Sequence, residues 1–266
     1  MSDYGKHIRL NRILRANKKK TLVVAFDHPA IFGPIPGTLN PAEQIRIFAD
    51  NGADAVLMNL GMLRIAGGGM LNERAPALII RLDWTTAWTA VSSGDALRSE
   101  LVVRPEEALR YGADAVMTYL FVGTGDNEFE AREIKRNAEV ARECEQLGIP
   151  LIVETLARGK NVQNPTSPEW IKLHTRIAVE LGADVLKTEY TGDVETMREV
   201  IQVCPAPMLV LGGALKPISE AMDIVKGAVA AGAAGLVFGR NVFQSRDVAA
   251  TLRELRSTLD QSSNQE

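Results

Sequence analysis

Short apolar runs recur along the chain at intervals that suit one strand and one helix each. The runs are rich in Val, Ile and Leu and do not alternate with polar residues, which is typical of parallel strands buried on both faces. Eight strands are therefore predicted, at Thr21–Phe26, Ala53–Met58, Leu78–Leu82, Ala113–Thr118, Leu151–Thr155, Val185–Thr188, Met208–Leu211 and Gly235–Phe238.

A repeated phrase marks the junction between a helix and the strand that follows it. The copies are Asn51-Gly-Ala-Asp-Ala-Val56, Tyr111-Gly-Ala-Asp-Ala-Val116, Leu181-Gly-Ala-Asp-Val-Leu186 and, more loosely, Ala231-Gly-Ala-Ala-Gly-Leu236. A glycine directly before a buried run indicates the end of a helix and a tight turn into the strand.

Proline and capping residues indicate where the intervening helices begin. Proline stands at an expected first helical position at Pro41, Pro105, Pro168 and Pro217. The phrase Asn127-Glu-Phe-Glu130 predicts a capping box before an amphipathic helix that ends near Leu147. The stretch between Leu82 and Pro105 shows little helix signal, and we interpret it as a long active-site loop with a short helix.

Eight strand–helix units without a dividing linker favour a closed (β/α)8 TIM barrel. The alternative with the same elements is an open, doubly wound sheet. We expect one domain over residues 1–266, with a short N-terminal extension (1–20) and a frayed polar tail (about 258–266).

Composition and charge exclude several classes of partner. The net charge of −3 gives no electrostatic reason to expect nucleic acid or an anionic membrane surface. No apolar run approaches the roughly 18 residues that a membrane helix needs, and Met1–Leu10 lacks the apolar core of a signal peptide. The two cysteines, Cys144 and Cys204, have no zinc-like spacing, so we expect a reducing, cytoplasmic setting.

In a barrel of this kind the chemistry lies at the C-terminal ends of the strands. Lys187 is the sharpest candidate there, because it interrupts an apolar strand in which burial is expected to lower the pKa of its amine. Such a lysine can attack a carbonyl group and form a Schiff base. The alternative is a lysine that leaves the strand end to pair with Glu189 or Asp27. Other polar residues at strand ends are His28, Asn59, Asp83, Tyr119 and Glu154.

Glycines after the last two strands form a second candidate site. Gly212-Gly213 and Gly239-Arg240 follow strands seven and eight, where barrels often bind phosphate through backbone N–H groups. Glycine lets the backbone approach an anion closely, and Arg240 can bind two phosphate oxygens. The alternative is that the glycines only close the turns. The three histidines are too scattered for a zinc site, and we predict neither metal nor cofactor.

Several segments of the chain together match one known pattern. They are Val24-Ala-Phe-Asp-His28 and Gly33-Pro-Ile-Pro-Gly37 at the first strand, Arg158-Gly-Lys-Asn-Val-Gln-Asn164 after the fifth, Leu181-Gly-Ala-Asp-Val-Leu-Lys187 at the sixth and Gly239-Arg-Asn-Val-Phe-Gln244 after the eighth. They resemble the first loop, the fifth-strand loop, the Schiff-base strand and the phosphate segment of the archaeal-type class I aldolase family, and the resemblance covers about Gly5 to Leu255. The family includes fructose-bisphosphate aldolases, aminodideoxyheptulosonate synthases and autoinducer-2 phosphate thiolases.

The resemblance implies a metal-free barrel that acts on a phosphorylated ketose or dicarbonyl compound through an imine. Lys187 would carry the imine, and Asp27 would orient it or relay protons. The substrate and its phosphate would be bound by His28, Gly212, Gly213, Gly239 and Arg240. Because members often form rings or decamers, the resemblance also implies a homo-oligomer.

Two departures from the family's pattern bear on the substrate. The family's Tyr-Pro-Arg-Gly phrase reads Leu156-Ala-Arg-Gly159 here, and a leucine cannot transfer the proton that the tyrosine transfers. Glu154, Tyr119, Glu189 or His28 could take over, and Glu154 is our choice. The family's Asp-His-Gly reads Asp27-His28-Pro29, which changes the first loop. Both departures speak against fructose bisphosphate as the substrate.

The sequence thus predicts a class I aldolase that makes or cleaves a carbon–carbon bond in a phosphorylated ketose or related keto compound. Three alternatives stay open. The first is a thiolase or transaldolase-type transferase that uses the same lysine imine, and the second is a non-catalytic sugar-phosphate-binding protein. The third is a metal-dependent barrel lyase.

Overall fold

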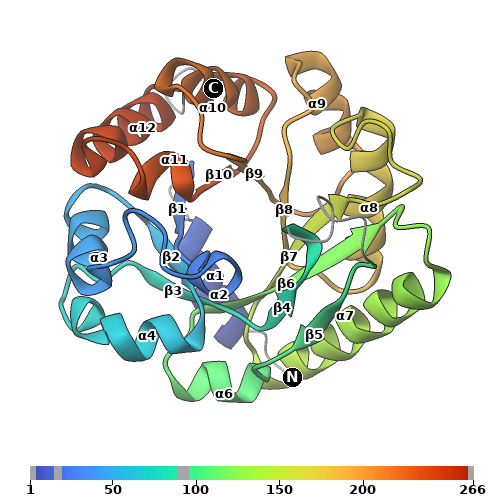
Figure 1. Ribbon diagram of the computed structural model, residues 1–266, viewed down its shortest axis with the longest axis horizontal. Coiled ribbons are helices and arrows are strands. Elements are labelled where there is room, and N and C mark those ends of the chain that lie inside the picture. Colours follow the sequence, from blue (N-terminus) through green and yellow to red (C-terminus); the bar gives the residue numbers. More distant parts are fainter. Residues whose placement is uncertain (1–3, 15–19, 89–95, 263–266) are drawn as a thin grey trace.

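In the computed structural model, eight parallel strands form a closed barrel inside a ring of helices (Figure 1). The structure describes residues 4–14, 20–88 and 96–262. The barrel strands are β1 (Thr21–Ala25), β2 (Ala55–Met58), β3 (Ala77–Arg81), β6 (Ala115–Val122), β7 (Leu151–Ala157), β8 (Val185–Thr188), β9 (Met208–Leu211) and β10 (Gly235–Phe238). They follow one another around the barrel in chain order, and β10 closes on β1. The eight predicted strands and the TIM barrel are confirmed, and the open sheet is excluded.

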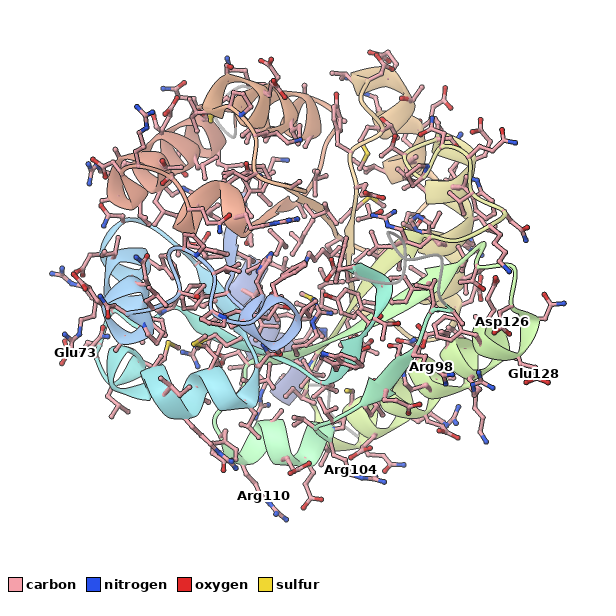
Figure 2. All side chains as sticks on the ribbon, in the orientation of Figure 1. Glu73, Arg98, Arg104, Arg110, Asp126 and Glu128 are labelled. Atoms are coloured by element: carbon pink, nitrogen blue, oxygen red, sulfur yellow. The ribbon has the colours of Figure 1, made fainter. Side chains whose placement is uncertain are left out.

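The helices precede or follow the strands in the chain, and most of them cover the outside of the barrel. They are α1 (Tyr4–Leu14), α2 (Pro29–Phe32), α3 (Pro41–Asp50), α4 (Leu60–Ala66), the 3-10 turn η1 (Gly67–Met70), α6 (Pro105–Arg110), α7 (Asn127–Leu147), α8 (Pro168–Glu180), α9 (Val194–Gln202), α10 (Ile218–Ala230), α11 (Arg240–Phe243) and α12 (Val248–Ser262). Charged side chains such as Glu73, Arg110 and Glu128 project outward from this ring (Figure 2).

Two predicted helix starts are off by one residue. Pro41, Pro105 and Pro168 do begin their helices, but Pro217 precedes α10, which starts at Ile218. The cap of α7 is Asp126 and not Asn127, because its carboxylate accepts a hydrogen bond from the backbone N–H of Phe129. The same helix ends at Leu147 as predicted, and Gly148 follows in the left-handed conformation.

The repeated phrase forms the same junction each time. Its glycines have φ values of 94° (Gly52), 83° (Gly112), 104° (Gly182) and 98° (Gly232), in the region that favours glycine. The aspartates two residues later accept hydrogen bonds of 2.8–2.9 Å from a backbone N–H of the neighbouring strand: Asp54 from Leu22, Asp114 from Leu78 and Asp184 from Leu151. These carboxylates therefore join adjacent strands at the N-terminal end of the barrel.

Helix α1 covers this N-terminal end. Ile13 packs with the apolar side chains that fill the barrel interior, and the Thr21 hydroxyl donates a hydrogen bond to its carbonyl. Nζ of Lys6 lies 3.0 Å from Oδ1 of Asp184, and Nη1 of Arg12 lies 2.6 Å from Oδ1 of Asp114. The segment that we predicted only as an extension (1–20) thus contributes to the barrel core. Because α1 covers the N-terminal end, a ligand can enter the barrel only from the opposite, C-terminal mouth.

Two further predictions about the chain need correction. The stretch after β3, which we expected to be a loop, contains an antiparallel hairpin of β4 (Asp83–Thr85) and β5 (Ser99–Leu101). The short helix expected there falls partly on residues 89–95, outside the described residues. The tail predicted from about residue 258 is still helical, because α12 continues to Ser262. Within the described residues, no helix is long and apolar enough to span a membrane.

Candidate active site

The register of the barrel aligns three polar side chains on neighbouring strands. Tyr119 of β6 is paired with Glu154 of β7, and Glu154 is paired with Lys187 of β8. Paired residues of parallel strands point to the same face of a sheet. All three side chains therefore project into the C-terminal mouth, where they are only 3% (Tyr119), 3% (Glu154) and 6% (Lys187) exposed.

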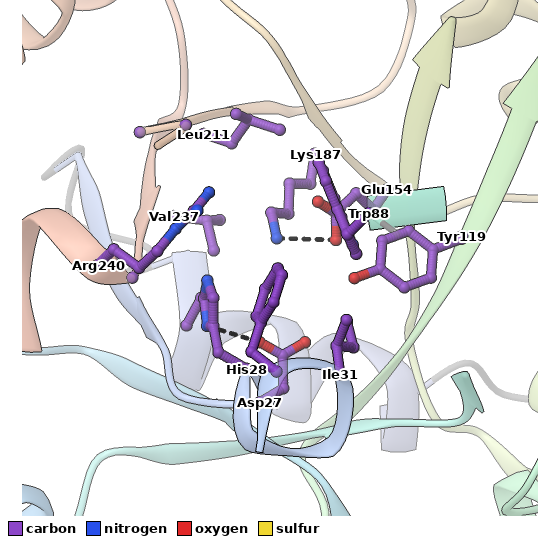
Figure 3. Close-up of a pocket in the computed structure, with 15 residues that line it drawn as sticks. Asp27, His28, Ile31, Trp88, Tyr119, Glu154, Lys187, Leu211, Val237 and Arg240 are labelled. Atoms are coloured by element: carbon purple, nitrogen blue, oxygen red, sulfur yellow. Dashed lines mark ion pairs between the residues drawn. The ribbon is translucent and has the colours of Figure 1, made fainter. Parts of the chain in front are cut away.

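The residues predicted for catalysis and for phosphate binding line one pocket at this mouth (Figure 3). They are Asp27, His28, Glu154, Lys187, Gly212, Gly213, Gly239 and Arg240. Ile31, Phe32, Trp88 and Tyr119 complete much of the wall. In Figure 3 the Lys187 amine points to the centre of the pocket, between Arg240 on one side and Tyr119 on the other.

Lys187 and Glu154 form a buried ion pair. The amine Nζ lies 2.8 Å from Oε2 of Glu154. Burial alone would raise the pKa of Glu154, but the adjacent Lys187 and Arg81 cations outweigh it and hold the pKa below its usual value. Glu154 is therefore an ionised carboxylate at neutral pH, placed to accept a proton from the amine.

Arg81 connects this pair to Asp27. Its guanidinium is 2% exposed, lies 3.0 Å from Oδ2 of Asp27 through Nε, and donates a hydrogen bond to Glu154 through Nη2. The guanidinium carbon also lies 3.8 Å from the ring centroid of Tyr119, within the range of a cation–π contact. Our sequence reasoning missed Arg81, although it showed the same signal as Lys187, a cation inside an apolar strand.

Asp27 and His28 stand side by side at the end of β1. Burial would raise the pKa of Asp27, but Arg81, His28 and Lys187 together keep it below its usual value, so this carboxylate is ionised. Burial lowers the pKa of His28 to about 4, so its imidazole is neutral at pH 7. Nδ1 of His28 lies 3.4 Å from Oδ1 of Asp27, and the ring packs against Phe243 at a centroid distance of 5.2 Å.

The glycine turns after β9 and β10 form the side of the pocket near Arg240. Gly213 has a φ of 71°, which favours glycine, and an added Cβ at Gly239 would lie 2.4 Å from Cε1 of His28. Asn241 connects the two turns, because its amide donates hydrogen bonds to the carbonyls of Gly212 (3.0 Å) and Ala214 (3.1 Å). Nε of Arg240 is buried and has no hydrogen-bond partner within the described residues, so it is available to an anion.

Other predicted candidates lie outside the pocket. Asn59 donates a hydrogen bond to the Asp27 carbonyl, and Asp83 accepts one of 2.7 Å from the backbone N–H of Tyr119. Glu189 forms a bidentate pair with Arg158. His174, one of the three histidines that are too scattered for a zinc site, is fully buried in α8, and burial lowers its pKa to about 3. These residues support the site or the core and do not line the pocket.

Leu156 occupies the strand position at which the resemblance expects a tyrosine. It pairs with Phe121 across β6 and β7 and belongs to a buried apolar cluster with Tyr119 and Phe129. The side of the mouth above Glu154 is therefore apolar. In the part of the chain that the structure describes, no group of three His, Cys, Asp or Glu side chains is arranged to hold a metal ion; the metal-free reaction stays a prediction.

Comparison with known proteins reveals a family match along most of the chain. Residues 21–245 match the model of the DeoC/LacD family aldolases. An uncharacterised aldolase of Saccharolobus solfataricus is 36% identical over 250 residues, which cover 91% of this chain and 90% of that protein. The 2-amino-3,7-dideoxy-D-threo-hept-6-ulosonate synthase of Halobacterium salinarum is 34% identical over 244 residues, with coverages of 92% and 87%.

A solved structure resembles this one over nearly the whole chain. It is an archaeal fructose-1,6-bisphosphate aldolase whose catalytic lysine is covalently bound to the carbinolamine intermediate of the substrate. The two structures superpose with a TM-score of 0.82 and 30% sequence identity, covering 95% of this chain and 98% of the other.

Proposed function

The chain belongs to the DeoC/LacD aldolase family and is a class I aldolase, and from this premise we propose that it makes or cleaves a carbon–carbon bond in a phosphorylated ketose or related keto compound, with the imine on Lys187. The observation that carries the proposal is the buried Lys187 amine, 2.8 Å from the Glu154 carboxylate, in the pocket that also contains Arg240. An amine and a proton acceptor at this distance are what imine formation needs.

The first steps convert the substrate carbonyl to an iminium ion. Glu154 takes a proton from the Lys187 ammonium, and the neutral amine adds to the carbonyl carbon. The carbinolamine then loses its hydroxyl group as water, and this step needs a proton on the hydroxyl oxygen. Glu154, now protonated, can return it because its oxygen already lies at hydrogen-bond distance from the lysine nitrogen.

In the cleavage direction the iminium withdraws the electron pair of the bond that breaks. The hydroxyl group beyond that bond loses its proton to Glu154, an aldehyde leaves, and an enamine remains on Lys187. Protonation of the enamine carbon and hydrolysis of the imine release the ketone product and restore the amine. In the synthetic direction the same steps run in reverse.

Asp27 and Arg81 adjust the charge around these steps. The ionised Asp27 carboxylate favours the positive iminium ion. Arg81 contacts both carboxylates and keeps them ionised and separate, so Glu154 can act as a base while Asp27 remains an anion. The substrate phosphate binds at Gly212-Gly213 and Gly239-Arg240, with the guanidinium of Arg240 as its cation.

Borohydride trapping tests the proposal. The protein is reduced in the presence of dihydroxyacetone phosphate and a panel of other phosphoketones, and its intact mass is measured. We expect a stable adduct that peptide mapping places on Lys187, and no adduct on Lys187→Met. Lys135→Met, a change of an exposed lysine on α7, is the matched control and should be labelled like the wild type. An adduct at another lysine, or turnover by Lys187→Met, would falsify the proposal.

The assembly and location of the protein are part of the same proposal. We propose a cytoplasmic homo-oligomer, a ring or a decamer, as the resemblance implies. Light scattering of the purified full chain measures its mass against the 28.9 kDa of one subunit. A monomer at micromolar concentration would contradict the oligomer without affecting the proposed chemistry.

A further inference from the structure

We infer that the substrate carries a single phosphate and that its half remote from this phosphate has no second anionic group. The inference rests on the proposed function and names its substrate class: ketoses phosphorylated beside the carbonyl, whose other product is an uncharged aldehyde. It follows from how the charges are distributed along the pocket.

The phosphate end has a cation that no carboxylate of the described residues neutralises. Arg240 lines the pocket, its Nε is buried without a hydrogen-bond partner, and its guanidinium carbon lies 5.7 Å from the ring centroid of Phe32. Nζ of Lys216 lies 4.0 Å from where a Cβ on Gly213 would stand, so a second cation belongs to the same end. One phosphate group satisfies this arrangement.

The charges in the middle of the pocket balance one another. Lys187 is paired with Glu154, and Arg81 lies against both Glu154 and Asp27. Two cations therefore face two carboxylates, and the His28 imidazole between them and Arg240 is neutral at pH 7 because burial lowers its pKa to about 4. No net positive charge remains here to attract a second anion.

The remote end of the pocket is built from uncharged side chains. Ile31, Trp88 and Tyr119 line it, and in Figure 3 they lie on the side of Lys187 away from Arg240. Behind Tyr119 the wall is closed by the apolar cluster that includes Leu156. Among the described residues, the cations that line the pocket are Lys187 and Arg240.

A guanidinium near this end is already engaged. The guanidinium carbon of Arg158 lies 5.7 Å from the ring centroid of Trp88, but Nη1 and Nη2 donate hydrogen bonds of 2.9 and 2.8 Å to the two carboxylate oxygens of Glu189. Nη1 also donates to the Ala157 carbonyl. The two side chains together have no net charge, so the pair offers a phosphate no unneutralised cation.

A phosphate dianion at the remote end would lose water without gaining a cation, which is unfavourable. A singly phosphorylated ketose places only hydroxyl groups and carbon there, which Tyr119 and Trp88 can contact.

A pair of ketoses that differ only in the remote phosphate tests the inference. Cleavage of fructose 1-phosphate and of fructose 1,6-bisphosphate is measured with the wild-type chain, together with borohydride trapping of both. We expect kcat/KM for the monophosphate to exceed that for the bisphosphate by about tenfold or more, since an unpaired buried charge costs at least as much as a charged hydrogen bond contributes. Equal or better use of the bisphosphate overturns the inference. An absence of adduct with both ketoses contradicts the proposed function itself.

Glu189→Gln tests the same inference from the opposite direction. The change keeps the size of the side chain and removes its charge, so Arg158 gains a net positive charge beside Trp88. We expect the ratio of kcat/KM for bisphosphate over monophosphate to rise by about tenfold, with the monophosphate value within about twofold of wild type. Glu180→Gln, which breaks an exposed pair with Arg176 on α8, is the matched control and should leave the ratio unchanged. An unchanged ratio in Glu189→Gln overturns the inference.

Discussion

Nζ of Lys187 lies 2.8 Å from Oε2 of Glu154, across the ladder that joins β8 to β7. The relationship is set by the backbone, because the two residues are register partners and their side chains point to the same side of the barrel. A rigid scaffold of this kind keeps the amine and the carboxylate together without the entropy cost of ordering a loop. Nη2 of Arg81 donates a hydrogen bond to the same oxygen, Oε2 of Glu154.

Glu154→Gln should separate proton transfer from binding. The glutamine keeps the size of the side chain and cannot accept the proton, so we expect kcat to fall by about 100-fold or more. Phosphate binding and a slow borohydride adduct on Lys187 should persist.

Because the pKa of Glu154 lies below its usual value, wild-type kcat/KM should not decline between pH 8 and pH 5 through protonation of this residue. Steady-state kinetics measure kcat of the variant and the pH dependence of wild-type kcat/KM, with the exposed Glu128→Gln as control. If Glu154→Gln keeps the wild-type kcat, another group transfers the proton.

Arg81→Met should destabilise the folded chain. The change leaves the buried Asp27 and Glu154 carboxylates with one cation fewer, and breaking a buried ion pair in this way costs about 3–5 kcal/mol. Chemical denaturation measures the free energy of unfolding. Arg110→Met, which removes an exposed pair with Glu106 at the outer rim (Figure 2), should cost less than about 1 kcal/mol.

Arg81→Lys tests the same contacts by activity. The lysine keeps a cation but cannot contact both carboxylates, so the variant should fold and still lose activity. Wild-type activity in this variant would show that the contacts of Arg81 with Asp27 and Glu154 are dispensable.

Glu133 on α7 should make stability depend on pH. Burial, with a smaller contribution from the nearby Asp83 and Glu100, raises the pKa of Glu133 to about 8. Arg136, whose Nη1 lies 2.8 Å from Oε1 of Glu133, opposes this rise but does not cancel it. The folded pKa is above the ordinary value of 4.5. As the pH rises from about 4.5 to about 8, the unfolded chain therefore loses a proton that the folded chain retains, and the free energy of unfolding falls, by about 1.4 kcal/mol per pH unit at most.

The test of this pH dependence compares urea denaturation at pH 5 and pH 8. Glu133→Gln has no proton to lose, so its stability should change less between the two values than that of the wild type. Equal changes in the two proteins would mean that Glu133 titrates normally in the folded state.

Gly239→Ala should weaken binding of phosphorylated substrates. A Cβ at this position would lie 2.4 Å from Cε1 of His28 and 2.9 Å from the carbonyl oxygen of Ala25, so the turn or His28 must move. Small displacements of positioning groups are costly, and we expect KM to rise by about tenfold. Gly68→Ala is the control, because a Cβ there meets no described atom within 4 Å. Unchanged KM in Gly239→Ala would place the phosphate elsewhere.

Removal of metal ions should leave the reaction intact. A protonated imine supplies the electron sink that a Lewis-acidic metal supplies in other lyases, so turnover should persist after dialysis against a chelator. The metal content of the same sample is measured by mass spectrometry. Loss of activity that zinc or another divalent ion restores would point to the metal-dependent alternative.

Local patterns in the sequence were sufficient to predict the barrel and most of the mouth. Apolar runs such as Ala113–Thr118 are typical of parallel strands buried on both faces, and glycines such as Gly182 end the helices because glycine adopts positive φ easily. In a barrel the C-terminal strand ends meet at one mouth, so the positions of Lys187 and Arg240 followed from where their strands end.

The partners of those residues depended on the tertiary structure. Whether Lys187 pairs with Glu189, Asp27 or Glu154 depends on strand register, and a one-residue shift would turn Glu154 out of the pocket. Arg81 became part of the site only because closure of the barrel brings β1, β3 and β7 around one guanidinium. The sequence therefore determined which chemical groups stand at the mouth, and the closed barrel decided which charges neutralise one another there, because such contacts join residues far apart in the chain.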